Sequence, residues 1–183
     1  GAHIDDKILG TINKITDFQE LYIVFSAATD KGLECLHYFP QLTTLVLRID
    51  ALTEVGLEQV SALKHLRRLV VRADDVAETF FHSVSALTEL EELSIRQIDL
   101  RGDGLASLSH LTNLKRLHLS AYSDNSKPNF STYKKKVKLI IGDLPLLEEM
   151  SLRSDGATIE LHDLPKLKVL DASNNSVSDK GFI

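Results

Sequence analysis

The sequence predicts an α/β solenoid: a right-handed coil of about seven turns, with a concave parallel sheet on one side and helices on the convex side. One observation is a short apolar pattern that occurs in five evenly spaced copies, starting at positions 18, 42, 66, 90 and 114. Another is its internal spacing. Two apolar residues stand two apart, as in a strand, and the apolar residues before them stand three apart, as on one helix face. A pattern that returns at a constant interval of this size indicates a stacked repeat architecture.

The strands are expected where this pattern falls, because its first, fourth and sixth positions are apolar in every copy. Two further copies follow the first five, one after a longer interval and one after a shorter interval. Each strand adds one row to the sheet. The seven copies begin at Phe18, Leu42, Leu66, Leu90, Leu114, Leu147 and Leu167.

Helix starts are expected at Thr29-Asp30 and Thr53-Glu54. A hydroxyl there can accept hydrogen bonds from unpaired backbone N–H groups. A carboxylate there interacts favourably with the positive end of the helix dipole. Glycines precede the first apolar helical residue, which predicts close packing against a neighbouring turn. These are Gly32, Gly56 and Gly104.

The chain resembles the leucine-rich-repeat family, through L-x-x-L-x-L in six or seven units and the segment T-D-x-G-L at 29–33, repeated loosely at 178–182. The 24-residue unit is similar to the helical-convex type found in F-box-type and bacterial-effector proteins. The family's usual Asn after the strand is kept only at Asn175, so we expect irregular turns toward the convex side. The resemblance implies a protein–protein interaction module or scaffold.

We expect residues 1–183 to form a single domain that is part of a longer protein. Residues 1–14 would be a helical cap or a partial repeat, and residues 121–143 an extended repeat whose Ser-, Asn- and Lys-rich insertion loop either contacts a partner or is a tolerated surface loop. The C-terminal end falls inside a repeat, where another helix is expected to begin.

Composition favours a cytoplasmic, non-membrane protein. No apolar stretch is long enough for a membrane span and no signal peptide begins the chain. One cysteine, Cys35, fits a reducing compartment. The net charge of −5 argues against general binding of nucleic acid.

Three columns of side chains are expected to project from the sheet, because alternate strand residues point away from the core. The first alternates in sign from Arg68 to Glu149 and should neutralise itself. The third contains Arg48, Arg72 and Arg96 in consecutive units. Either nearby carboxylates offset these like charges, or the column receives carboxylates, or phosphates, from a partner. The carboxylates considered are Asp50, Asp74 and Glu92.

Candidate partner-binding residues come from the second and third columns and from the lysine run in the insertion loop. A solvated loop is the alternative for the lysines. The candidates are Arg48, Arg72, Arg96, Arg153, Tyr22, Val46, Val70, His118, Lys134, Lys135 and Lys136.

No catalytic, cofactor-binding or metal-binding residues are predicted, because the seven histidines show no metal-ligand spacing. His65 and His110 are expected to be partly buried structural residues. Cys35 is expected to be an unreactive side chain beside the core.

The leading hypothesis is therefore a non-enzymatic module that binds a protein partner, of acidic character, on its concave face. A second is the targeting part of a larger enzyme such as a ubiquitin ligase. A third is binding of nucleic acid or acidic lipid through the arginines and lysines, which would depend strongly on salt. The sequence leaves the oligomeric state open.

Overall fold

The computed structural model contains two parallel sheets, whose strands alternate along the C-terminal part of the chain. Seven strands form the larger sheet and three form the smaller one. The described residues are 4–12, 18–24, 27–76, 79–98, 104–121, 138–154, 157–173 and 175–179.

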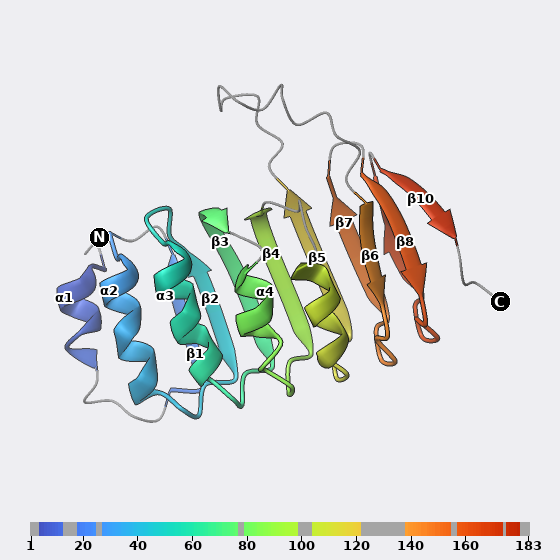
Figure 1. Ribbon diagram of the computed structural model, residues 1–183. Coiled ribbons are helices and arrows are strands. Elements are labelled where there is room, and N and C mark those ends of the chain that lie inside the picture. The colour runs from blue at the N-terminus through green and yellow to red at the C-terminus, as the bar shows by residue number, and fades with distance from the viewer. Residues whose placement is uncertain are drawn as a thin grey trace, which may run out of the picture.

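The seven-stranded sheet follows the apolar pattern in order, so the predicted parallel stack is confirmed (Figure 1). Equivalent positions of successive copies face each other across neighbouring strands, as in Leu45↔Leu69 and Leu69↔Leu93. The strands are β1 (Glu20–Val24), β2 (Thr44–Arg48), β3 (Arg68–Val76), β4 (Glu92–Ile98), β5 (Arg116–Ala121), β7 (Glu149–Arg153) and β9 (Val169–Asp171).

The core lies between this sheet and the convex side. Leu45 and Leu47 point inward from β2 and are fully buried, as are Leu36 and Leu57 from the convex elements. Each buried leucine contributes about 1.5–3 kcal/mol of transfer free energy, and the repeat supplies several per unit. Stacked apolar layers therefore hold the coil together.

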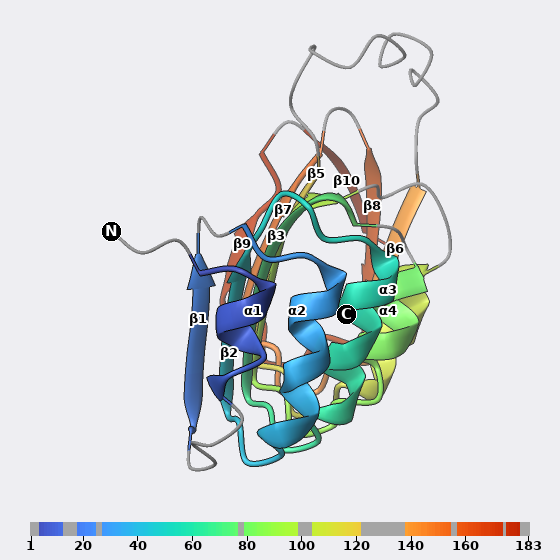
Figure 2. The same cartoon turned by 90° about the vertical axis from the view of Figure 1, so that its left-hand side faces the viewer.

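Short helices cover one face of the sheet over the first five strands and leave the opposite face, here called the open face, uncovered (Figure 2). Three of the elements are 3-10 helices. The elements are α1 (Asp6–Leu9), α2 (Asp30–Leu33), η2 (Glu34–Tyr38), α3 (Glu54–Glu58), η3 (Gln59–Ala62), α4 (Thr79–Val84) and η4 (Gly104–His110).

The convex side changes from helices to strands beyond β5. Strands β6 (Lys138–Gly142), β8 (Thr158–His162) and β10 (Ser176–Asp179) form the second parallel sheet there. Leu139 and Ile141, like Ile159 and Leu161, alternate with less buried residues, which is a strand period rather than a helical one. The expectation of convex helices is confirmed only for the earlier units. The helix expected to begin at the C-terminal end lies outside the described residues, which stop at Asp179.

The predicted N-terminal cap and the predicted insertion loop are described only in part. Helix α1 lies in the predicted terminal cap and buries Leu9, but the capping role itself stays a prediction. Most of the predicted insertion loop, 122–137, lies outside the described residues.

Two aspartates each bind the start of the next unit's helix. Asp6 accepts hydrogen bonds from the backbone N–H and the hydroxyl of Thr29, both at 2.7 Å. Asp30 does the same with Thr53, at 2.8 and 2.6 Å. Both threonines are N-caps, as predicted, but only the Thr53 hydroxyl also accepts a bond from its own helix, from Val55 N–H. Burial acts to raise the pKa of Asp6, but the bonds from Thr29 and Gly32 outweigh it and lower that pKa.

The same aspartates explain two of the predicted glycines. A Cβ on Gly32 would lie 2.5 Å from Asp6 Oδ1 and 2.8 Å from Leu9 Cδ1. A Cβ on Gly56 would lie 2.8 Å from the Asp30 Cα and clash with its carboxylate. The close-packing role predicted for these two glycines is therefore confirmed.

We expect Asp30→Ala to lower the free energy of unfolding by about 1 kcal/mol, because Thr53 loses its acceptor for two hydrogen bonds. Urea denaturation at pH 7 measures this loss. Asp30→Asn keeps one acceptor oxygen and should cost less, and Glu58→Ala, which removes an exposed carboxylate, is the control. An Asp30→Ala effect no larger than that of Glu58→Ala would contradict the role given to Asp30.

Candidate functional site

The open face presents the three columns that the sequence predicts. Strand pairing places Arg48 opposite Arg72, and Arg72 opposite Arg96, on β2, β3 and β4. Since neighbouring strands lie about 4.8 Å apart, these three backbones are immediate lateral neighbours. We call Arg48, Arg72 and Arg96 the arginine column.

Two residues of the arginine column, Arg48 and Arg96, present their positive charge at the surface. Arg48 and Arg96 are exposed and Arg72 is half-buried. Within the described part of the chain, neither Arg48 nor Arg96 has an ion-pair partner. Like charges this close repel by about 1 kcal/mol per pair in a water-like medium. The column thus presents exposed positive charge on β2 and β4.

Glu92, one of the carboxylates considered as an offset, is committed elsewhere. It pairs with Arg68 at 2.9 Å and with Arg116 at 3.0 Å, and its side chain is 17% exposed. Asp50 is exposed and forms no ion pair with Arg48. The Asp74 side chain lies outside what the structure describes. Neither Glu92 nor Asp50 therefore neutralises the column by an ion pair.

Arg68, Glu92 and Arg116 form a charge ladder on the first column, so the predicted self-neutralisation is confirmed for these three residues. Burial acts to raise the pKa of Glu92, but hydrogen bonds and charge from Arg68 and Arg116 outweigh it and lower that pKa.

A second ladder, which the sequence analysis missed, lies one residue before the first. Glu91 binds Lys115 at 2.7 Å and lies 3.7 Å from Arg67. Glu148 binds Lys168 at 3.0 Å in the same row. The side chains of adjacent glutamates such as Glu91 and Glu92 thus diverge and belong to different charge ladders.

Arg153 differs from the arginine column although it occupies the same register. Its guanidinium binds Asp171 at 2.9 Å while the side chain stays 66% exposed. The Ser173 hydroxyl and the Arg153 guanidinium hold the pKa of Asp171 well below its usual value. Sequence reasoning missed this pair because it joins the third column to the second.

The second column is less accessible than expected. Val46 and Val70 are only 5% and 9% exposed, and Val70 lies between Val46 and Ser94 in the register. Their predicted exposure is therefore wrong, and Ser94 beside them is also buried. Tyr22 is exposed and its hydroxyl donates to Glu20 Oε2, whereas His118 is half-buried between Ser94 and Ser151 in the register.

The remaining predicted site residues, Lys134, Lys135 and Lys136, lie outside the described residues. They are not placed relative to the arginine column.

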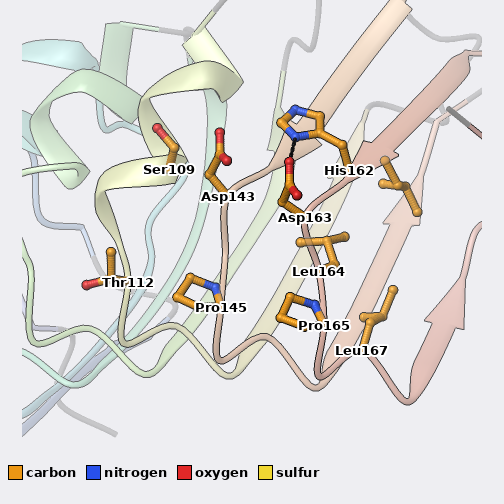
Figure 3. Close-up of a pocket in the computed structure, with 10 residues that line it drawn as sticks. Ser109, Thr112, Asp143, Pro145, His162, Asp163, Leu164, Pro165 and Leu167 are labelled. Atoms are coloured by element: carbon orange, nitrogen blue, oxygen red, sulfur yellow. Dashed lines mark hydrogen bonds and ion pairs between the residues drawn. The ribbon is translucent and has the colours of Figure 1, made fainter. Parts of the chain in front are cut away.

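A hollow of about 920 Å³ lies on the convex side, where η4 gives way to the turns after β6 and β8 (Figure 3). Ser109 and Thr112 line one side, and Pro145 and Pro165 lie in the turns. The hollow forms where the convex layer changes from helix to strand.

Asp143, His162 and Asp163 gather at this hollow, with possible ligand atoms within 4.8 Å of one another. His162 Nδ1 lies 3.0 Å from Asp163 Oδ2. Both aspartates have a positive φ, 56° and 50°, and follow corresponding strands, so each also makes a turn. The two carboxylates are exposed and the imidazole is half-buried. Sequence reasoning missed the cluster because Asp143 comes from a different unit.

Two histidine expectations are wrong. His65 is exposed and lies 3.1 Å from Glu89, and His110 is exposed with its ring 3.0 Å from the Ser107 carbonyl oxygen. Both sit beside apolar repeat positions but point outward. Cys35 is buried as expected, and burial raises the pKa of its thiol to about 11.

No protein-family model matches the sequence, and a search of curated proteins finds no relative. Among solved structures, the crystal structure of internalin C2 from Listeria monocytogenes, a leucine-rich-repeat protein, matches 92% of this chain with a TM-score of 0.52. The fold is a leucine-rich-repeat solenoid. The sequence identity is 19% and the chain spans 64% of the internalin C2 chain, so the likeness is one of fold. None of the described helices is long and apolar enough to cross a membrane.

We expect Glu92→Gln to lower the free energy of unfolding by about 1 kcal/mol at pH 7, allowing for screening of partly exposed pairs. The lowered pKa means that the carboxylate stabilises the fold above its unfolded pKa of about 4.3. That contribution is lost as the pH falls through the folded pKa. Urea denaturation at pH 7 and at successively lower pH should show the two proteins converging; a constant difference would contradict the ladder.

Cys35 should resist alkylation by iodoacetamide at pH 7.5, because a thiol with a raised pKa is almost wholly protonated and this one is buried. Mass spectrometry should find little adduct on the folded chain and complete labelling in urea. Equal rates in both conditions would show that the thiol is accessible in the folded state.

Proposed function

We propose that this solenoid is a non-enzymatic protein-interaction module that binds an acidic segment of a partner protein on its open face. The observation that carries the proposal is the pair of exposed arginines Arg48 and Arg96 in the arginine column, which have no ion-pair partner among the described residues. Guanidinium groups bind carboxylates in a bidentate way, which gives both affinity and orientation. A rigid sheet holds these groups in fixed order.

The fold supports this use of the open face. Residues of the arginine column point away from the core, so they can vary without disturbing the packed leucines. Tyr22 adds an exposed aromatic ring at the β1 end, and such rings are common in interface anchors. Together these groups supply charge and apolar contact area.

We infer that the first units belong to the 24-residue helical-convex type of repeat, because α2, α3 and α4 follow successive strands on the convex side. We also infer a cytoplasmic setting, supported by the single, buried and unpaired Cys35.

Affinity capture from the source cells, read by mass spectrometry, tests the function with Arg48→Glu/Arg96→Glu against wild type. Neither arginine has an ion-pair partner among the described residues, so the variant should keep its thermal stability. We expect it to lose the captured protein partner at least tenfold, because reversed charges repel its carboxylates. Lys64→Glu/Lys166→Glu, which reverses two exposed charges in the turns before β3 and β9, is the control with the same change in net charge.

The same bound proteins on the arginine variant and on the control would overturn the proposal. Retention on a DNA or heparin column at 150 mM salt, lost in the arginine variant, would instead favour a polyanion ligand.

A further inference from the structure

The cluster of Asp143, His162 and Asp163 lies on the convex side, so it is separate from the arginine column on the open face. Pairing of β6 with β8 places Gly142 opposite His162, and the two aspartates therefore follow at corresponding positions of neighbouring strands. Figure 3 shows the three side chains at one end of the hollow, with the two prolines at the other. The fold thus brings one imidazole and two carboxylates from two units to one place.

The distances within this cluster suit a single metal ion. One possible ligand atom from each residue lies within 4.8 Å of the others, and His162 Nδ1 is 3.0 Å from Asp163 Oδ2. Zinc bonds of about 2.0–2.2 Å to nitrogen and oxygen, arranged as a tetrahedron, separate two ligand atoms by about 3.4 Å. The widest pair therefore has to close by at most about 1.4 Å, which rotation of an exposed aspartate side chain provides.

The two aspartates also carry negative charge that no cation of the described residues neutralises. Asp143 forms no ion pair within the described part of the chain, and Asp163 pairs there only with the half-buried imidazole of His162. On the open face, by contrast, Glu92 and Asp171 each bind an arginine. A divalent cation between the two aspartates would take the place that arginine takes in those pairs.

Gly142 leaves the space in which the imidazole lies. A Cβ on Gly142 would clash with the His162 ring at Cε1, Nδ1 and Nε2. The ring therefore lies against the backbone of β6, where glycine leaves room for it. This contact keeps the imidazole beside the turn that carries Asp143.

The donor atoms indicate the class of ion. Imidazole nitrogen together with carboxylate oxygen suits zinc and similar divalent ions, whereas Mg²⁺ and Ca²⁺ prefer oxygen ligands alone. Three protein ligands leave one position of a zinc tetrahedron open. Because the hollow of about 920 Å³ borders the cluster, that position is accessible to water or to a donor atom of a bound molecule.

We propose that Asp143, His162 and Asp163 bind one zinc ion, through an imidazole nitrogen and one oxygen from each carboxylate, with the fourth position facing the hollow. The ion joins the turns after β6 and β8, and so links two neighbouring units on the convex side. This site is independent of the proposed function, which concerns the open face.

Isothermal titration calorimetry of the metal-free protein with ZnCl₂ tests the proposal. We expect one saturable site with a Kd of about 10 µM or tighter, and no saturable binding of MgCl₂ in the same range. Zinc should bind at least tenfold more weakly to Asp143→Asn, to Asp163→Asn and to His162→Gln, because loss of even an outer partner of a metal ligand costs about 10–100-fold in affinity. Asn also tolerates the positive φ of both aspartates.

Two control variants, His65→Gln and Asp50→Asn, remove an exposed imidazole and an exposed carboxylate elsewhere on the chain. They should bind zinc as the wild type does, and circular dichroism without metal checks that every variant is folded. The proposal is overturned by a wild type without saturable zinc binding, by a folded ligand variant that binds as tightly as the wild type, or by an equal loss in the controls. The last result would mean that exposed side chains bind zinc non-specifically.

Discussion

Lateral hydrogen bonding between the strands of successive repeats decides which side chains become neighbours in this molecule. Backbone bonds from Arg67 to Thr43, from Glu91 to Arg67 and from Lys115 to Glu91 repeat the same link from unit to unit. From β1 to β5, equivalent positions of successive repeats stay paired up to the third column. Each of these repeat positions therefore forms a column of side chains across the strands. Leucines then meet leucines in the core, glutamates meet basic residues in the ladders, and arginines meet arginines on the open face.

The strands and their register could be predicted because apolar positions repeat on both short and long periods. Thr53 and Gly56 could be placed at a helix start for the same reason. The ion pair of Arg153 with Asp171 could not, because it runs diagonally between columns instead of joining equivalent positions of two repeats. The burial of Val46 and Val70 could not be predicted, because alternation gives the direction of a side chain and not its exposed area.

In the shortest unit, a strand on the convex side suits the length of the chain. The chain returns from Glu149 on β7 to Val169 on β9 in fewer residues than it uses between earlier partners such as Thr44 and Arg68. A strand advances about 3.3 Å per residue and a helix about 1.5 Å, so an extended segment covers the return path with fewer residues. β8 provides that segment, and β6 and β10 pair with it.

The bonds that Asp6 and Asp30 make to the following helices tie the first units together on a second face, in addition to the sheet. Opening one of these units breaks contacts in both neighbours, so local unfolding there is costly. At the other end of the sheet, Val169 and Leu170 on β9 are 53% and 39% exposed although Leu170 occupies a core position of the repeat. Fraying, and the earliest exchange of backbone amide hydrogens, therefore belongs to the β9 end, while the β2 and β3 amides report the opening of the whole stack.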